Sequence, residues 1–299
     1  MKGFPIALAF FPFLLLNGAE TVFFERPLKT GDRFECLVNT SQSQQYTLQM
    51  PSVERPAVRL NTVKVNLSGI LTVKKVNSAG KALEIEFEVH SVNGRAVETQ
   101  TIAGKSFTGN LAKAPAEFKS ENGIISKETE ILLASVFRPV SAHGLTELTG
   151  QSHVLAHPGE SWSPDLTAFS ETLRKRRILL PPSDIKGRIT YTGKDLFRGL
   201  ECFTFRFFIQ SKKIAGYDFR FSALIQLPVN PADGPAVRVT REATEVIDRL
   251  LPASNPLAAG AKLKLISSDK TEMMLFPVRF LKKKPVTKEQ ESFWDSLLR

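Results

Sequence analysis

Strict alternation of apolar and polar residues is the feature that most constrains how this chain folds. Residues 83–90 read LEIEFEVH, with an apolar residue at every odd position and a glutamate or histidine at every even one. Successive side chains of a β-strand point to opposite faces, so this segment predicts a strand with one buried and one solvated face. Such strands are typical of antiparallel sheets. The three glutamates are expected to face water rather than to form a catalytic pair.

The neighbouring segments predict further antiparallel strands. Residues 63–76 are rich in β-branched residues, and residues 77–80 supply a turn that joins them to residues 83–90 as a hairpin. Asn93 and Gly94 form the dipeptide most typical of tight hairpin turns, which predicts a second turn at that position.

A similar design recurs later in the chain. Residues 187–191 begin a strand, a turn is predicted at Arg198 and Gly199, and residues 202–209 alternate again. The two regions are either diverged copies of one β-meander unit or independently similar hairpins.

Two segments depart from the alternation. Residues 126–137 start with Ser126 as a candidate N-cap and carry acidic residues in the first turn. Residues 241–251 place apolar residues at helical spacing and end at Pro252. Both segments predict short amphipathic helices that pack on a sheet.

The expected fold is therefore mainly β with a few short helices. Its antiparallel sheet is expected to form a curved incomplete barrel or a sandwich. We place a first β-rich unit at residues 20–140, a second unit packed with it at 141–280, and a basic tail at 281–299.

The amino-terminal residues have the order of a cleavable signal peptide. Lys2 precedes an apolar run over residues 4–16, and small residues follow at positions 18 and 19. A transmembrane helix needs about 20 apolar residues, which neither this run nor any later one provides. We expect residues 1–19 to be removed, and the mature chain, beginning near Glu20, to be periplasmic or extracellular without a transmembrane segment.

Cys36 and Cys202 are the two cysteines of the chain. An even pair in a protein sent to an oxidising compartment predicts one disulfide. The alternative is two buried thiols that pack as small apolar side chains.

The polar residues form no recognisable catalytic or metal-binding motif. His143, His153 and His157 lie in one region, but glycine and proline beside them oppose the helix that the spacing of the last two would need. Ser161 lacks the second glycine of a nucleophile elbow. Phosphate-binding loops and dinucleotide fingerprints do not occur either. We assign no catalytic residue, metal or cofactor.

The chain is basic, with a formal net charge of +10, but its charges are scattered. The densest cluster, at residues 174–177, is interpreted as a solvated loop. Scattered charge and export together argue against a nucleic-acid partner.

The use of phenylalanine is unusual, with 22 Phe against 3 Tyr and 2 Trp. Phe208 falls on the opposite side of its strand from the alternating phenylalanines, so we expect both sides of that strand to be covered. A close-packed core explains the block, and so does an apolar pocket that holds an acyl chain against a curved sheet. The candidate pocket residues are Phe203, Phe205, Phe207, Phe219 and Phe221.

Several features together resemble a known class of proteins. They are the signal, the long strands, the unit starts at residues 31–34 and 159–162, and the strand at 190–193 before the phenylalanine block. In these the chain resembles exported, uncharacterised bacterial proteins distantly similar to the lipoprotein carrier and acceptor (LolA and LolB) superfamily. The resemblance covers most of residues 28–278 and implies an incomplete barrel closed by helices around an apolar cavity for lipid. The chain is longer than the compact carriers, and no binding residue of that superfamily can be placed on it.

These observations favour a non-enzymatic envelope protein that binds a lipid, another hydrophobic ligand or a partner polypeptide. Two alternatives remain open. One is an exported hydrolase with an unrecognised site, and the other is a structural or adhesive β-sandwich.

Overall fold

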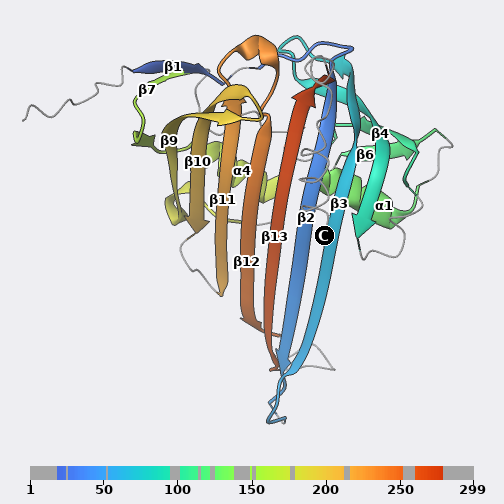
Figure 1. Ribbon diagram of the computed structural model, residues 1–299. Helices are drawn as coiled ribbons and strands as arrows, with labels where there is room; N and C mark the ends of the chain where they lie inside the picture. The colour runs from blue at the N-terminus through green and yellow to red at the C-terminus, as the bar shows by residue number, and fades with distance from the viewer. Residues whose placement is uncertain are drawn as a thin grey trace, which may run out of the picture.

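Eleven antiparallel strands form one open sheet, which confirms the predicted β-rich fold (Figure 1). The computed structural model describes residues 19–24, 26–51, 53–94, 102–113, 116–121, 125–137, 149, 153–175, 179–211, 216–251 and 260–278. The predicted signal up to residue 18, His143 and the predicted tail lie outside these residues.

The strands and helices follow one another along the chain with these bounds. They are β1 (Glu20–Phe23), β2 (Arg33–Gln49), β3 (Ala57–Val76), β4 (Ala82–Gly94), β5 (Ser106–Asn110), β6 (Glu117–Ser120), α1 (Lys127–Val136), β7 (His153–Ala156), β8 (Ser161–Trp162), α4 (Leu166–Lys175), η2 (Pro182–Asp184), β9 (Ile185–Phe197), β10 (Leu200–Ser211), β11 (Tyr217–Pro228), η3 (Pro231–Asp233), β12 (Arg238–Leu250) and β13 (Lys262–Pro277).

The order of the strands places the first and last strands of this sheet along the chain, β2 and β13, side by side in its middle. Across the sheet the order is β6, β5, β4, β3, β2, β13, β12, β11, β10, β9 and β8, while β1 and β7 form a separate pair. β13 therefore lies between β2 and β12, and strands of both predicted units share one sheet. The two edge strands, β6 and β8, are four and two residues long.

The first predicted hairpin is confirmed, but the second turn is wrong. The Asn77 side chain accepts hydrogen bonds from the amides of Ala79 and Lys81, and Gly80 has a positive φ of 73° in the turn between β3 and β4. Asn93 and Gly94 instead continue β4, opposite Asn66 and Val65 of β3. Pairing with the long neighbouring strand overrides the local turn preference.

The predicted helix at residues 241–251 is also wrong, because this segment belongs to strand β12. It pairs along its length with β11 on one side and β13 on the other. Two long neighbours satisfy its backbone hydrogen bonds, and its valine, threonine and isoleucine residues suit a strand.

The helix predicted at residues 126–137 is confirmed as α1. The Ser126 hydroxyl accepts a hydrogen bond from the Thr129 amide at 3.2 Å, as an N-cap does. The helix α4 was not predicted. It starts beside Asp165, whose carboxylate accepts hydrogen bonds from the Thr167 and Ala168 amides. Because α4 extends to Lys175, the start of the basic cluster at 174–177 is helical rather than a loop.

The sheet has an inner face that is covered and an outer face that is not covered by these elements. The helices α1 and α4 lie behind the sheet in Figure 1, and the β1–β7 pair packs on the same inner face. Cys36 and Val38 of β2 belong to one inner-face cluster with Phe87 and Phe137, and Phe205 belongs to a second.

Four strands extend beyond this covered part as a projecting blade (Figure 1). We define the blade as residues 43–49 of β2, 57–64 of β3, 244–250 of β12 and 262–268 of β13. All eight blade residues of β3 are exposed. Within the part of the chain that the structure describes, no helix has the length and apolarity needed to cross a membrane.

Candidate ligand-binding face

The alternating phenylalanines of β10 lie on the inner face, where protein side chains cover them. Phe203, Phe205 and Phe207 are all buried. The ring of Phe205 has its centroid 5.4 Å from that of Phe24 and 5.2 Å from that of Tyr191. Aromatic pairs at this separation stabilise a core beyond the area they bury. These rings form a packed cluster beneath the β1–β7 pair.

Phe219 and Phe221 of β11 form a second, adjoining group. Phe169 of α4 lies with its ring centroid 5.9 Å from that of Phe219 and 6.4 Å from that of Phe221. Phe221 also borders the first cluster. The structure thus places all five candidate residues on one face, in one group covered by the β1–β7 pair and another covered by α4.

The expectation that both sides of β10 are covered is wrong at Phe208, which lies on the outer face with 42% of its surface exposed.

A polar network interrupts the apolar inner face at its centre. The Arg241 guanidinium of β12 lies 3.6 Å from the Asp269 carboxylate of β13 and 3.4 Å from the Thr271 hydroxyl. Thr271 also donates a hydrogen bond to Asp269 and contacts the hydroxyl of Thr40 on β2 at 3.1 Å. Thr40 and Thr271 are buried, and the Arg241 side chain is nearly so. This network can meet the polar end of an amphiphilic molecule without leaving its own groups unpaired.

Below this network, a row of apolar side chains on the inner face crosses three strands of the blade and the neighbouring strand β11. The strand register places Tyr46, Leu265, Ile247 and Tyr217 side by side on β2, β13, β12 and β11. All four are partly exposed. We call these four residues the inner apolar row. The row continues the group of Phe219 and Phe221 along the inner face, and its member Tyr217 packs against the same cluster.

The sequence did not predict the inner apolar row, because residues 241–251 were expected to form a helix rather than a strand. Helical spacing places Val246 and Ile247 on one face, whereas in β12 they point to opposite faces. The β-branched residues Val239, Thr240, Thr244, Val246 and Ile247 were the signal that favoured a strand.

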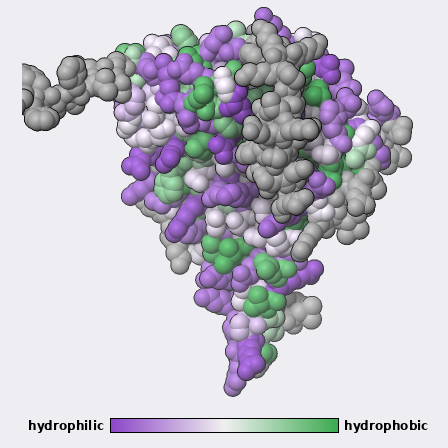
Figure 2. Space-filling view, in the orientation of Figure 1, coloured by the Kyte–Doolittle hydropathy of each residue, from purple (hydrophilic) through white to green (hydrophobic). Residues whose placement is uncertain are grey.

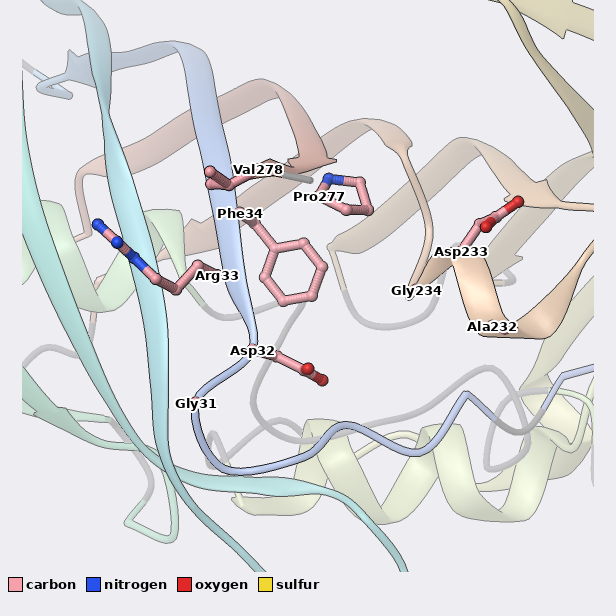
Figure 3. A pocket seen from close by; sticks show the side chains of 9 residues that line it. All are labelled: Gly31, Asp32, Arg33, Phe34, Ala232, Asp233, Gly234, Pro277 and Val278. Carbon is pink, nitrogen blue, oxygen red and sulfur yellow. The ribbon is translucent and has the colours of Figure 1, made fainter. Parts of the chain in front are cut away.

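A small hollow opens at the other end of the sheet, where β2 begins and β13 ends (Figure 3). Its volume is about 250 Å³, and the Phe34 ring lines it, with the Asp32 and Asp233 side chains on either side of the ring. Its lining residues are Gly31, Asp32, Arg33, Phe34, Ala232, Asp233, Gly234, Pro277 and Val278. Asp32 already accepts a hydrogen bond from the Lys29 amide. The hollow is small and carries carboxylates, so it does not suit an acyl chain.

Arg26 lies near this hollow with its guanidinium nitrogens buried and without hydrogen bonds to the described residues. Burial lowers the pKa of Arg26 to about 10, while the side chains of Cys202 and Asp233 act in the opposite direction. Arg26 is therefore still charged at neutral pH and offsets the nearby carboxylate.

The predicted disulfide between Cys36 and Cys202 is wrong, since both are buried free thiols. Cys36 lies on β2 and Cys202 on β10, four steps apart in the sheet, or about 19 Å at the usual strand spacing. A disulfide needs Cα atoms within about 7 Å. Cys36 also packs on the inner face, whereas Cys202 packs with Met274 and Phe276 on the outer face. Burial raises the pKa of the Cys202 thiol to about 11, so it is unreactive at neutral pH.

The described histidines of this region and Ser161 have structural contacts of their own. The His153 ring of β7 lies tilted by 35° against the Phe23 ring, with centroids 5.9 Å apart, and the Ser161 hydroxyl lies 2.7 Å from that of Thr190. Among the residues that the structure describes, no three histidine, cysteine, aspartate or glutamate side chains gather as a metal site. Glu86 pairs with Lys74 at 2.9 Å on the solvated face of β4, as the alternation predicted.

Comparison with known proteins adds little to this geometry. No protein-family model and no curated protein matches the chain. Solved structures with similarity include an outer membrane lipoprotein-sorting protein domain from Vibrio parahaemolyticus, with 10% identity, 91% of this chain and 93% of that chain covered, and a TM-score of 0.21. DynF from the dynemicin biosynthesis pathway of Micromonospora chersina has 11% identity, 92% and 93% coverage and a TM-score of 0.15. A DUF1329 family protein from Desulfovibrio piger has 8% identity, 81% and 85% coverage and a TM-score of 0.14. The first belongs to the group that the sequence resembles, but superpositions this loose decide neither fold nor function.

Proposed function

We propose that this chain is an exported, non-enzymatic binding protein that holds the apolar part of a lipid-like ligand against the inner face of its sheet. The observation that carries the proposal is the inner apolar row. Its four side chains keep part of their surface in water, although they directly continue a buried aromatic group. Exposed apolar surface that is continuous across several strands is typical of a binding site.

The surroundings of the row suit an amphiphilic ligand. Phe219 and Phe221 border the row on β11, and the cluster of Phe203, Phe205 and Phe207 lies further along the same face. Toward the covered part, the inner face next to the row carries Glu245, Ser267 and Gln44, and the network of Arg241 and Asp269 lies beyond them, so polar groups are gathered on this side of the row. A site with a mostly apolar surface and a few polar groups at one end is what an acyl chain with a polar head requires.

The inner apolar row has a matched control on the opposite side of the same two strands. Ile247 and Leu265 pair on the inner face, and the neighbouring residues Val246 and Ile266 pair on the outer face. We expect the double variant Ile247→Thr, Leu265→Thr to weaken the binding of a fluorescent fatty-acid analogue by at least about tenfold, because each substitution removes apolar contact with the ligand. The variant Val246→Thr with Ile266→Thr is expected to bind like the parent.

Native mass spectrometry of protein purified from its own envelope complements this titration. A lipid that travels with the parent and is lost from the inner-face variant supports the proposal. Parent protein that binds no probe, or equal loss of binding in both double variants, contradicts it.

A further inference from the structure

The tip of the blade exposes apolar side chains. We define the tip as residues 47–51, 53–60, 249–251 and 260–264. Val58 and Leu60 of β3 are 59% and 65% exposed, and Leu250 of β12 is 70% exposed. Figure 2 shows hydrophobic surface among the hydrophilic surface of this narrow lower part. Grouped apolar side chains of this kind mark an interaction surface.

The charged residues of the tip are almost all basic. Glu54 is the single acidic residue of the tip, against the five exposed basic residues Arg55, Arg59, Arg249, Lys262 and Lys264. The whole chain is far more balanced, with 40 basic and 30 acidic residues. Lys262 contacts Asp248, just outside the tip, at 3.4 Å. The tip is thus both apolar and positively charged.

We propose that the blade tip docks on a lipid bilayer whose surface carries anionic headgroups. Apolar side chains that enter the boundary between headgroups and acyl chains, with lysine and arginine beside anionic phosphates, are the recognised chemistry of interfacial binding. This inference rests on the tip alone and does not require the proposed ligand site.

The shape of the blade allows the tip to reach such a surface. The eight exposed residues of β3 span about 25 Å at the usual rise of a strand, so the tip lies well beyond the covered part of the sheet. A symmetric contact between the tips of two copies would bring the five basic residues of each copy together. Repulsion between like charges disfavours that contact, whereas the same basic residues are attracted to an anionic lipid surface.

Vesicle co-sedimentation tests the proposal with the exported protein, after its amino terminus has been established by sequencing. The vesicles contain phosphatidylcholine alone or phosphatidylcholine with one quarter phosphatidylglycerol. We expect binding to the anionic vesicles that weakens as salt is raised, because salt screens surface charges. Each basic side chain near an anionic surface contributes about fivefold in affinity, so Arg59→Gln, Lys262→Gln and Lys264→Gln together should weaken binding by at least about tenfold.

Substitutions elsewhere on the surface provide matched controls. Val58→Thr with Leu60→Thr removes apolar surface from the tip, and Leu155→Thr with Leu196→Thr removes it from exposed positions of β7 and β9. Lys119→Gln, Lys186→Gln and Arg188→Gln remove three exposed basic side chains outside the blade. We expect loss of binding from the tip variants and parental binding from the controls.

Three results would overturn the proposal. Equal binding to both kinds of vesicle would show that anionic headgroups are not recognised. Equal loss of binding in the tip and control variants would show that the tip is not the binding surface. A change from dimer to monomer in the tip variants, measured by analytical ultracentrifugation, would instead make the tip a contact between copies. Retained binding of the fatty-acid analogue by the tip variants shows that the ligand site is intact, so the two proposals fail separately.

Discussion

The covered part of the sheet and the projecting blade use the same strands but differ in what lies against them. On the inner face, Val38 of β2 and Met273 of β13 are buried in the covered part, whereas Tyr46 and Leu265 of the same strands remain partly exposed in the blade. The strand pairing continues without a break through both parts. Hydrogen bonding between strands therefore maintains the blade, while burial under β1, β7 and the helices stabilises the covered part. Stability and binding surface are thus separated along the same strands.

The largest effect is expected where the covered part is most closely packed. Phe205→Ala removes a ring with no exposed surface and leaves a cavity between Phe24, Tyr191 and Trp162. We expect the free energy of unfolding to fall by about 3–5 kcal/mol. Phe208→Ala, on the outer face of the same strand, should cost less than about 1 kcal/mol. Urea denaturation of both variants measures the difference, and a small loss at Phe205 would mean that space already exists beside it.

A smaller effect is expected at the polar network between the two parts. Arg241→Met leaves Asp269 and Thr271 without their charged partner, and we expect a loss of about 1–3 kcal/mol because the pair is partly exposed. Glu242 and Lys270 pair on the outer face of the same two strands at 2.6 Å, both largely exposed. Lys270→Met should leave the urea midpoint unchanged. Equal effects of the two substitutions would show that the inner network has no special role.

A pH-dependent effect is expected where β1 contacts the covered part. Burial acts to raise the pKa of Glu20, but hydrogen bonds from Lys194 and Tyr191 outweigh it, so the pKa lies below its usual value. The resulting stabilisation is complete above the ordinary glutamate pKa and is lost as the pH falls through the lower pKa of the folded state. Glu20→Gln should therefore lower the melting temperature at pH 7 and have little effect near pH 2. A constant difference across this range would contradict the assignment.

The smallest effect on stability is expected in the blade. Val58→Thr keeps a β-branched residue at an exposed strand position, so the free energy of unfolding should change by less than about 0.5 kcal/mol. Thermal and urea unfolding of this variant measure the change. A large loss of stability would show that the blade packs against something that stabilises the fold, and would contradict the difference proposed between the blade and the covered part.

Local patterns predicted the elements whose structure depends on neighbours in sequence. The β3–β4 hairpin, the turn at Arg198 and Gly199 and the helix α1 follow from alternation, turn residues and an N-cap. The turn at Asn93 and Gly94 and the helix at residues 241–251 failed, because a long partner strand decides the conformation there.

The candidate site depended on contacts that local patterns do not contain. The alternating phenylalanines were placed correctly on one face, but their separate covers by Phe24 and Phe169 come from remote parts of the chain. The distance between Cys36 and Cys202 depends on the order of the strands, which nothing local indicates. For the same reason the sequence did not predict the blade, since which parts of a strand are packed against other elements depends on the tertiary structure.

The central position of β13 has a consequence for how the chain folds as it is made. β2 pairs with β13 across more than 200 intervening residues, so this contact forms after nearly all of the described chain has been synthesised. Until then, β2 presents a 17-residue edge with unpaired backbone groups. Such an edge readily adds strands from other chains, and nascent proteins that carry one aggregate unless the edge is protected. The finished sheet ends in the short strands β6 and β8, but the growing chain has a long exposed edge, which makes assembly rather than the folded state the stage most exposed to aggregation.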